Sequence, residues 1–338
     1  MIFWIEASKQ IGMGHLMESL AIAEVFQAHD IPFHFIINHY QPAEELLASK
    51  NILFDVTPVN KTDKIFQSIM RYSRKNCVIV NHRNVLLSVL LQLKKRSVNT
   101  IVIDQLGNKT VACDLLVNSA LVPEWLKYTF KGKQPECYFG PRFVILRNEF
   151  TTAHKKEKIF GRGLKTILVS MGGVDRSGAA FRIIEALQLI KGPLRKEIVL
   201  GKGFAHIDKF SEMRRRIKDP LFNFCQGVDD MAERIYKADL MISAGGNTAY
   251  EMACAGTPGL ILWEDLHEKS QAQVFAEKGV ALELGNGMRA PILEIRDSIK
   301  GLLDDTEKRI QMSQCGKRLV DGQGINRIFK DITELVQK

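Results

Sequence analysis

Short apolar runs alternate with segments of helical periodicity along the chain, and this alternation predicts the fold class. The first apolar runs cover residues 2–5, 32–37, 53–56, 77–80, 100–103 and 115–118. Apolar residues recur at helical spacing between them, at residues 15–28, 43–49, 61–72 and 85–95. Apolar strands that alternate with helices are typical of parallel sheets covered on both faces. We therefore predict a doubly wound α/β domain in the first part of the chain.

The same alternation starts again after a polar segment, TTAHKKEKIFGRG, at residues 151–163. Strands are predicted at residues 166–170, 197–200, 221–224, 240–242, 259–262 and 281–284. Helices are predicted at residues 178–190, 229–236, 246–255 and 269–277, and the tail after Met288 is mostly helical in pattern. We expect an N-terminal domain at 1–150, a linker at 151–163 and a C-terminal domain at 164–338. Two such domains would face each other across a cleft at the carboxyl ends of their strands.

Composition narrows the choice of partners. The chain has 338 residues, 46% hydrophobic and 25% charged, with a net charge of +9. That excess fits an anionic ligand, nucleic acid or an anionic membrane surface. The basic runs at 94–96, 155–158 and 214–216 lack interleaved aromatic residues, so we interpret them as solvated helix faces and expect no nucleic-acid partner.

Cysteine usage and hydropathy predict the compartment. The six cysteines are scattered, with no CxxC pair, which is typical of free thiols in a reducing compartment. No basic segment precedes the first apolar run, so a signal peptide is not expected. No apolar run approaches the roughly 20 residues that span a bilayer. We expect a cytoplasmic protein that is not inserted in a membrane; peripheral association and the oligomeric state stay open.

Two glycine-containing turns in the second half of the chain are candidate anion sites. Gly172 and Gly173, followed by Asp175, separate a predicted strand from a predicted helix. The second turn has the sequence Gly245, Gly246, Asn247, Thr248, with Glu251 one helical turn later. Glycines allow close backbone approach, and a helix N-terminus favours an anion. Thr248 could donate to a phosphate and Glu251 could accept from ribose hydroxyls. The alternative is that the glycines only close the turns.

A third turn, GMGH, follows the first predicted strand and contains Gly12, Gly14 and His15. A dinucleotide fingerprint would require glycine where Met17 stands, and an acid after the second strand. A histidine at a helix N-terminus is held neutral and can accept a proton as a general base. The alternative is that His15 caps its own helix. Asp104 and His82 end neighbouring predicted strands and are further candidates.

Together these motifs resemble the UDP-sugar hydrolases of the PseG- and SpsG-like family within the GT-B superfamily; MurG-like glycosyltransferases are more distant relatives. The resemblance runs through GMGHLMESLAIA, VIDQLGN, CDLLVN, YFGPRFVILRNEF, VSMGGVD and SAGGNTAYEMACAGTP. It implies the GT-B architecture, two Rossmann-like domains facing a cleft, with UDP bound mainly by the C-terminal one. It also implies that Gly245 to Thr248 meet the diphosphate and that Glu251 meets the ribose.

The resemblance further implies that His15 activates water for inverting attack at the anomeric carbon of a UDP-linked amino-deoxy sugar, releasing UDP. Neither a metal nor a cofactor would be required. The pathway would be nonulosonic-acid or surface-polysaccharide synthesis. Two alternatives stay open: an inverting UDP-sugar glycosyltransferase for a cell-surface glycan, and a nucleotide-binding homologue without catalysis.

The chain departs from the family pattern at several positions. Glu18 stands where the family has arginine in GxGHxxR, and Asn81-His82-Arg83 replaces an Asp-Asp-Tyr type sequence. An Asp-Asp pair is Asp104-Gln105 here, and an Asn-Gln pair is His267-Glu268. We expect Asp104, His267 and Glu268 still to contact substrate. The departures indicate a different sugar, an acceptor other than water, or loss of catalysis.

Overall fold

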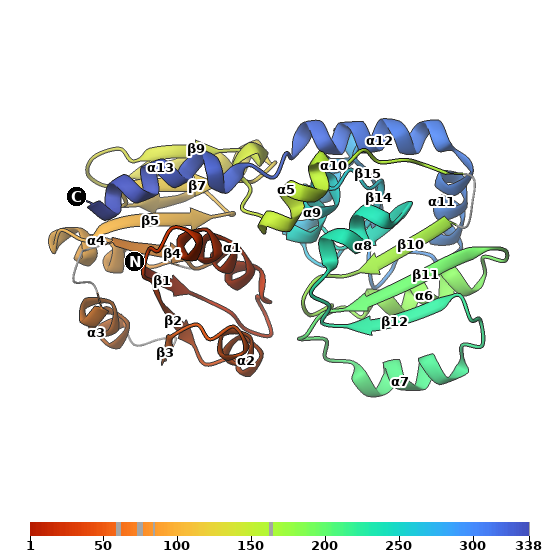
Figure 1. Ribbon diagram of the computed structural model, residues 1–338, viewed down its shortest axis with the longest axis horizontal. Coiled ribbons are helices and arrows are strands. Elements are labelled where there is room, and N and C mark those ends of the chain that lie inside the picture. Colours follow the sequence, from red (N-terminus) through yellow and green to blue (C-terminus); the bar gives the residue numbers. More distant parts are fainter. Residues whose placement is uncertain (59–61, 73–76, 84, 162–164, 338) are drawn as a thin grey trace. The chain divides into compact units, whose positions relative to one another are not determined.

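The computed structural model describes residues 1–58, 62–72, 77–83, 85–161 and 165–337. These form two compact units, which are labelled by element in Figure 1. Unit 1 contains Met1–Arg147 and Gly322–Lys338, and unit 2 contains Asn148–Asp321. The chain therefore leaves unit 1 once and returns to it for its last helix.

Unit 1 is built on a parallel sheet of seven strands in the order β3-β2-β1-β4-β5-β7-β9 (Figure 1). Its strands are β1 (Ile2–Ile5), β2 (His34–Asn38), β3 (Phe54–Thr57), β4 (Cys77–Asn81), β5 (Asn99–Asp104), β7 (Leu115–Asn118) and β9 (Glu136–Phe139). A small parallel pair, β6 (Lys109–Val111) and β8 (Tyr128–Phe130), lies outside this sheet. From β1 the chain adds β2 and β3 on one side, and from β4 it adds β5, β7 and β9 on the other. The boundary between β1 and β4 is therefore the topological switch point of the sheet.

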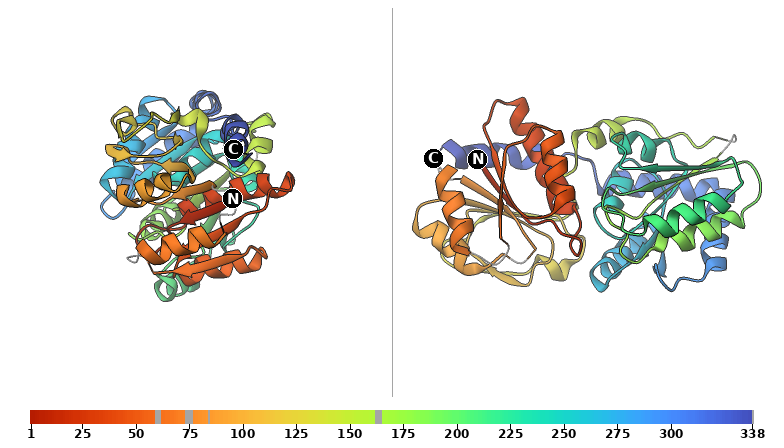
Figure 2. Two further views of the ribbon diagram at one scale, coloured as in Figure 1. Left: turned by 90° about the vertical axis from the view of Figure 1, so that its left-hand side faces the viewer. Right: turned by 90° about the horizontal axis from the view of Figure 1, so that it is seen from below.

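Helices cover both faces of the unit 1 sheet, as the further views show (Figure 2). Phe3 and Ile5 of β1 pack in one cluster with apolar residues of α1 (Gly14–Ala28), α2 (Gln41–Ser49) and α13 (Gly324–Gln337). Ile2 and Trp4 of the same strand pack on the opposite face with α3 (Thr62–Tyr72) and α4 (Leu87–Lys95). Since both faces are buried, the strands are apolar at successive positions. Two 3₁₀ turns, Pro123–Leu126 and Pro141–Phe143, complete the unit.

Unit 2 has a parallel sheet of six strands in the order β12-β11-β10-β13-β14-β15, the order of dinucleotide-binding folds. The strands are β10 (Lys165–Ser170), β11 (Leu194–Leu200), β12 (Phe222–Gln226), β13 (Leu240–Ser243), β14 (Gly259–Trp263) and β15 (Ala281–Asn286). The helices are α5 (Asn148–Lys155), α6 (Ala179–Gln188), α7 (Ile207–Arg216), α8 (Met231–Lys237), α9 (Asn247–Cys254), α10 (Leu266–Glu277), α11 (Ile292–Asp304) and α12 (Thr306–Leu319).

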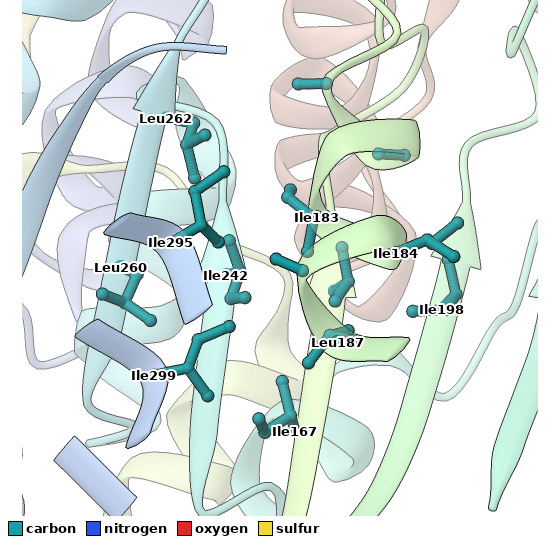
Figure 3. Close-up of a cluster of buried hydrophobic side chains, with 14 of the residues drawn as sticks. Ile167, Ile183, Ile184, Leu187, Ile198, Ile242, Leu260, Leu262, Ile295 and Ile299 are labelled. Carbon is teal, nitrogen blue, oxygen red and sulfur yellow. The ribbon is translucent and has the colours of Figure 1, made fainter. Parts of the chain in front are cut away.

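The core of unit 2 joins α6 and α11 to one face of the sheet (Figure 3). Ile183 and Leu187 of α6 pack beside Ile242 of β13, and Ile295 of α11 packs beside Leu260 of β14. All five side chains are fully buried. Burial of an aliphatic side chain of this size contributes about 1.5–3 kcal/mol, so this cluster holds the strands that carry the glycine turns.

The predicted α/β class is confirmed, and each predicted strand forms within a few residues of its expected ends. The first predicted helix, 15–28, begins one residue earlier, at Gly14. The start of the predicted helix 61–72 lies outside the described residues. Strands β6, β8 and β9 and helices α5 and α7 were not predicted, because their short or strongly charged segments carry little apolar periodicity.

The division of the chain differs from the predicted boundaries at 150, 163 and 338. Helix α5 runs into the segment expected to be a linker, because Phe150 is fully buried in unit 2 and its carbonyl accepts from the Cys254 thiol. Helix α13 belongs to unit 1 rather than to the C-terminal domain, because its apolar residues Ile325, Ile328 and Ile332 complete the cluster on that sheet. An amphipathic helix does not encode which sheet it covers.

The basic run at 155–158 is only in part a solvated face, since Lys155 is exposed and Lys158 is partly buried. Arg214–Arg216 are exposed at the end of α7, as expected. Lys158 instead points its ammonium group at the carbonyls of Ile235, Tyr236 and Ala238, where α8 ends, and at the Thr257 hydroxyl. Burial lowers the pKa of Lys158 to about 7.

In the described parts of the chain, no helix combines the length and apolar character that crossing a membrane needs.

Candidate functional site

In unit 1, the GMGH turn follows β1 and Asn81 ends β4, so both lie at the topological switch of the sheet. Ligands of open parallel sheets bind at the carboxyl ends of strands at such a point. The turn is tight: the Gly12 amide donates to the Ser8 carbonyl at 2.7 Å. Gly12 has a φ of +83°, a conformation that favours glycine. Gly14 is the first residue of α1, and Met13 precedes it as the N-cap residue without a side-chain cap.

The His15 ring contacts the end of β4 rather than its own helix terminus. Its Nδ1 lies 2.6 Å from Oδ1 of Asn81. Burial lowers the pKa of His15, and the Asn81 hydrogen bond and the Glu6 carboxylate only partly oppose this effect. The ring is therefore neutral at pH 7. The alternative that His15 caps its own helix has no support from these contacts.

Three positions that depart from the family pattern form one hydrogen-bonded cluster beside His15. Nδ2 of Asn81 donates to Oε2 of Glu18 at 3.1 Å, and Nε2 of Gln105 donates to Oε1 of Glu18 at 2.6 Å. Glu18 is 3% exposed and Asn81 is fully buried. Side-chain amides thus satisfy both carboxylate oxygens of Glu18. The substitutions in this chain are mutually compatible, and their compatibility could not be seen from spacing alone.

A second pair lies at the same end of the sheet. Nδ1 of His82 lies 2.9 Å from Oε2 of Glu6, which also accepts from the Arg83 amide at 3.2 Å. Burial alone would raise the pKa of Glu6, but the hydrogen bond and charge of His82 bring it below the ordinary value. Sequence reasoning missed Glu6. Its position directly after β1 was the signal that could have found it.

Asp104 ends β5 and is only 4% exposed. Oδ1 accepts from the Lys109 ammonium at 2.7 Å, and Oδ2 accepts from the Tyr128 hydroxyl at 2.6 Å and the Gly107 amide at 3.0 Å. Burial and the Asp104 carboxylate raise the pKa of Tyr128. Asp104 therefore ties β5 to the β6–β8 pair, and its predicted contact with substrate stays a prediction.

In unit 2, the two glycine turns follow β10 and β13, the neighbouring strands at the switch of that sheet. A β-carbon on Gly172 would lie 3.8 Å from Oγ1 of Thr248, so the turns meet. Gly172 has a φ of +78°. A β-carbon on Gly245 would lie 2.7 Å from the Glu268 carbonyl oxygen, which leaves room for glycine only. Gly246, Asn247 and Thr248 are partly exposed where α9 begins.

The remaining residues of the two turns are placed around this point. Gly173 follows Gly172, and its carbonyl accepts from the Gly203 amide at 3.0 Å. Glu251 lies in the middle of α9 and is partly buried. The Gly245 carbonyl accepts from Nε2 of Gln271 at 2.5 Å, which ties the turn to α10.

Asp175 is turned toward its own helix. Its two carboxylate oxygens accept from the amides of Ala179 at 2.9 Å and Ala180 at 3.1 Å. Burial raises the pKa of Asp175 to about 6. The side chain thus caps the beginning of α6, a role that the sequence did not indicate, and its contact with a nucleotide stays a prediction.

Acidic side chains border the beginning of α9. A β-carbon on Gly246 would lie 3.5 Å from Oε1 of Glu268. Oε2 of Glu268 accepts from the Glu264 amide at 2.8 Å. Burial raises the pKa of Glu268 to about 7, so this carboxyl is partly protonated at neutral pH. His267 precedes it in the first turn of α10 and is partly buried.

The Arg176 guanidinium lies beside the carboxylates of Glu264 and Asp265. Nε of Arg176 lies 2.9 Å from Oε2 of Glu264, and Nη2 lies 3.3 Å from Oδ2 of Asp265. The Ser177 amide also donates to Glu264. Arg176 and Glu264 were not among the predicted site residues, since single charges in loops carry no distinctive spacing.

Comparison with solved structures defines the class of protein. The chain matches Acinetobacter baumannii MurG with a TM-score of 0.68 and 13% identity, over 98% of this chain and 99% of that one. It matches Anabaena Alr3699/HepE in complex with UDP with a TM-score of 0.59 and 12% identity, over 98% and 99%. The chain has the GT-B fold.

Sequence comparison is more specific. The chain is 24% identical over 328 residues to the spore coat polysaccharide biosynthesis protein SpsG of Bacillus subtilis (strain 168), covering 97% of this chain and 96% of that protein. The chain is thus similar to SpsG over nearly the whole length of both proteins. It is also 24% identical over 216 residues to a UDP-N-acetylglucosamine transferase of Acetivibrio thermocellus that acts on N-acetylmuramyl-(pentapeptide) pyrophosphoryl-undecaprenol, covering 62% of this chain and 58% of that enzyme. No family model matches.

Proposed function

We propose that this protein is a nucleotide-sugar glycosyltransferase of polysaccharide biosynthesis, which transfers a sugar from UDP to a hydroxyl group of a cell-surface glycan. The observation that carries the proposal is the short distance between Gly172 and the Thr248 hydroxyl, because it shows that two strand-to-helix turns lie at one point of unit 2. Backbone amides and a helix N-terminus at such a point suit a diphosphate.

The nucleotide would be held by unit 2. The amides of Gly246 and Asn247 would face the diphosphate, Thr248 would donate its hydroxyl, and Glu251 would accept from the ribose. Support comes from the HepE structure, which has the same fold and a bound UDP. The sugar and the acceptor are not identified by these residues.

His15 of unit 1 would act as the base. It would take a proton from the acceptor hydroxyl while the acceptor oxygen attacks the anomeric carbon, the bond from that carbon to the diphosphate breaks, and UDP leaves with inversion. The low pKa of His15, caused by burial, supports this role, since a base must be unprotonated at working pH.

A transferase has more support than the hydrolase expected from the sequence. The Acetivibrio relative is named as a transferase, and SpsG is named for polysaccharide biosynthesis. Hydrolysis would use the same base with water in place of the acceptor hydroxyl. The two reactions therefore differ in the acceptor, and the acceptor is what the experiment must vary.

The test is UDP release from a panel of UDP-sugars, with and without glycan acceptors. Acceptor-dependent release supports the transferase, release without acceptor supports the hydrolase, and UDP binding with no turnover in any mixture supports a non-catalytic homologue. His15→Ala should lower turnover by about 10²–10⁴-fold and leave the Kd of UDP unchanged. Thr248→Val should weaken UDP binding, and Thr110→Val, on an exposed strand position of unit 1, serves as the control.

A further inference from the structure

The His15 ring is connected to Glu18 through the side-chain amide of Asn81. Nδ1 of His15 lies 2.6 Å from Oδ1 of Asn81. Nδ2 of the same amide donates to Oε2 of Glu18 at 3.1 Å and to the His15 carbonyl at 3.1 Å. It also lies 3.3 Å from the Ser19 hydroxyl. The three side chains form a continuous path from the carboxylate to the imidazole.

The orientation of the Asn81 amide follows from its partners. The Glu18 carboxylate and the His15 carbonyl accept hydrogen bonds and cannot donate them. The end of the amide that faces them must therefore be the NH₂ group. A flipped amide would set its oxygen against two acceptor oxygens in a fully buried position, which costs free energy because buried acceptors would be left without donors.

The tautomer of His15 follows from the amide. The Asn81 oxygen accepts only, so Nδ1 of His15 must carry the hydrogen that joins them. In a neutral ring the other nitrogen, Nε2, then has a free lone pair. Burial lowers the pKa of this ring, His82 and Arg83 lower it further, and the opposing effect of Glu6 is smaller than that of burial, so the ring stays neutral.

We propose that Glu18 is a positioning residue that acts through Asn81 to hold His15 in the Nδ1–H tautomer, so that Nε2 can accept a proton. Gln105 contributes by donating to the second oxygen of Glu18 at 2.6 Å, which holds the carboxylate toward Asn81. The value of this tautomer for catalysis rests on the proposed function, whereas the tautomer itself does not.

The experiment reads the tautomer directly in the full chain. Imidazole ¹⁵N chemical shifts are recorded at pH 8, and His15 is assigned by the loss of its signals in His15→Gln. The wild type should show a protonated Nδ1 and an unprotonated Nε2. In Glu18→Leu the fraction of the Nε2–H tautomer should rise, since the amide loses its charged acceptor and is held only by the His15 carbonyl and the Ser19 hydroxyl.

Two further variants separate positioning from general disruption. Glu18→Gln keeps an oxygen that can accept from Asn81 and should restore the wild-type shifts. Glu24→Leu, on an exposed position of the same helix, should leave the His15 shifts as they are in the wild type. If Glu18→Leu does not fold, the wild type and Glu18→Gln still test the proposal.

An Nε2–H tautomer in the wild type, or unchanged shifts in folded Glu18→Leu, would overturn the inference. Where turnover is measurable, Glu18→Leu should lower kcat by about 10- to 100-fold with little change in KM for the sugar nucleotide, and Glu18→Gln should recover most of it. A wild type with the expected tautomer and no turnover on any sugar nucleotide would contradict the proposed function and leave this inference standing.

Discussion

Oε1 of Glu268 lies 3.5 Å from the place that a β-carbon on Gly246 would occupy. A carboxyl group thus borders the turn at the beginning of α9, where an anion is expected to bind. Because burial raises the pKa of Glu268 to about 7, its charge at this point changes within the physiological pH range.

The first prediction concerns stability. The folded pKa of Glu268, about 7, lies above its ordinary value of 4.5, so the folded state binds more protons than the unfolded state between these values. The contribution of Glu268 to stability therefore falls as pH rises from about 4.5 to 7. Glu268→Gln should match the wild type near pH 4.5 and be more stable at pH 8, by about 1–3 kcal/mol. Urea unfolding at both pH values measures this difference. An equal effect at the two would contradict it.

The second prediction concerns nucleotide binding. A neutral Glu268 should favour a diphosphate beside Gly246, and a carboxylate should repel it. The Kd of UDP should rise for the wild type between pH 6 and 8, and more steeply than for Glu268→Gln. Isothermal titration measures the Kd of both proteins across this range. The ionisation of UDP itself affects both proteins equally, so the difference between their pH profiles reports on Glu268. Parallel pH profiles would show that Glu268 does not face the nucleotide.

The third prediction uses a pair of glycines in unit 2. Gly245→Ala would place a β-carbon 2.7 Å from the Glu268 carbonyl, and relieving such a clash costs about 1–3 kcal/mol. Gly301 lies inside α11, where a β-carbon would meet nothing within 4 Å. Gly301→Ala should therefore stabilise the protein by about 0.5–1 kcal/mol. Thermal unfolding should move in opposite directions for the two variants, and a stabilised Gly245→Ala would exclude the close approach.

The fourth prediction concerns Lys158. Its ammonium group donates to carbonyls at the end of α8 and to the Thr257 hydroxyl. Lys158→Met keeps the length of the side chain but removes the donor to the Tyr236 and Ala238 carbonyls, which should cost about 1–3 kcal/mol. Lys155→Met, at an exposed position of α5, should change the free energy of unfolding by less than about 0.5 kcal/mol. Equal effects of the two substitutions would mean that Lys158 is as solvated as its neighbour.

The fold class could be predicted because its signal is local. Fully buried strands such as β1 and β13 are continuous apolar runs, and the helices between them repeat at helical spacing. The domain boundaries could not be predicted in the same way. The apolar face of α13 shows that the helix is covered, but only long-range packing decides that the cover is the unit 1 sheet.

The candidate site, like the fold, could be predicted only where the signal is local in the sequence. Glycine turns after buried strands identified Gly172 and Gly245, since a turn and its backbone conformation are encoded within a few residues. The partners of each side chain were not encoded there. Asp175 and Asp104 looked alike as polar residues near strand ends, yet one caps α6 and the other joins β5 to a separate pair of strands.

The sequence by itself therefore determined the alternation of strands and helices, the turns at the strand ends and the histidine beside one of them. Only the tertiary structure decided that Glu18, Asn81 and Gln105, which are far apart along the chain, share one buried set of hydrogen bonds. The physical reason is that periodicity and turn chemistry depend on neighbouring residues, whereas hydrogen-bond partners and pKa values depend on what the folded chain brings into contact.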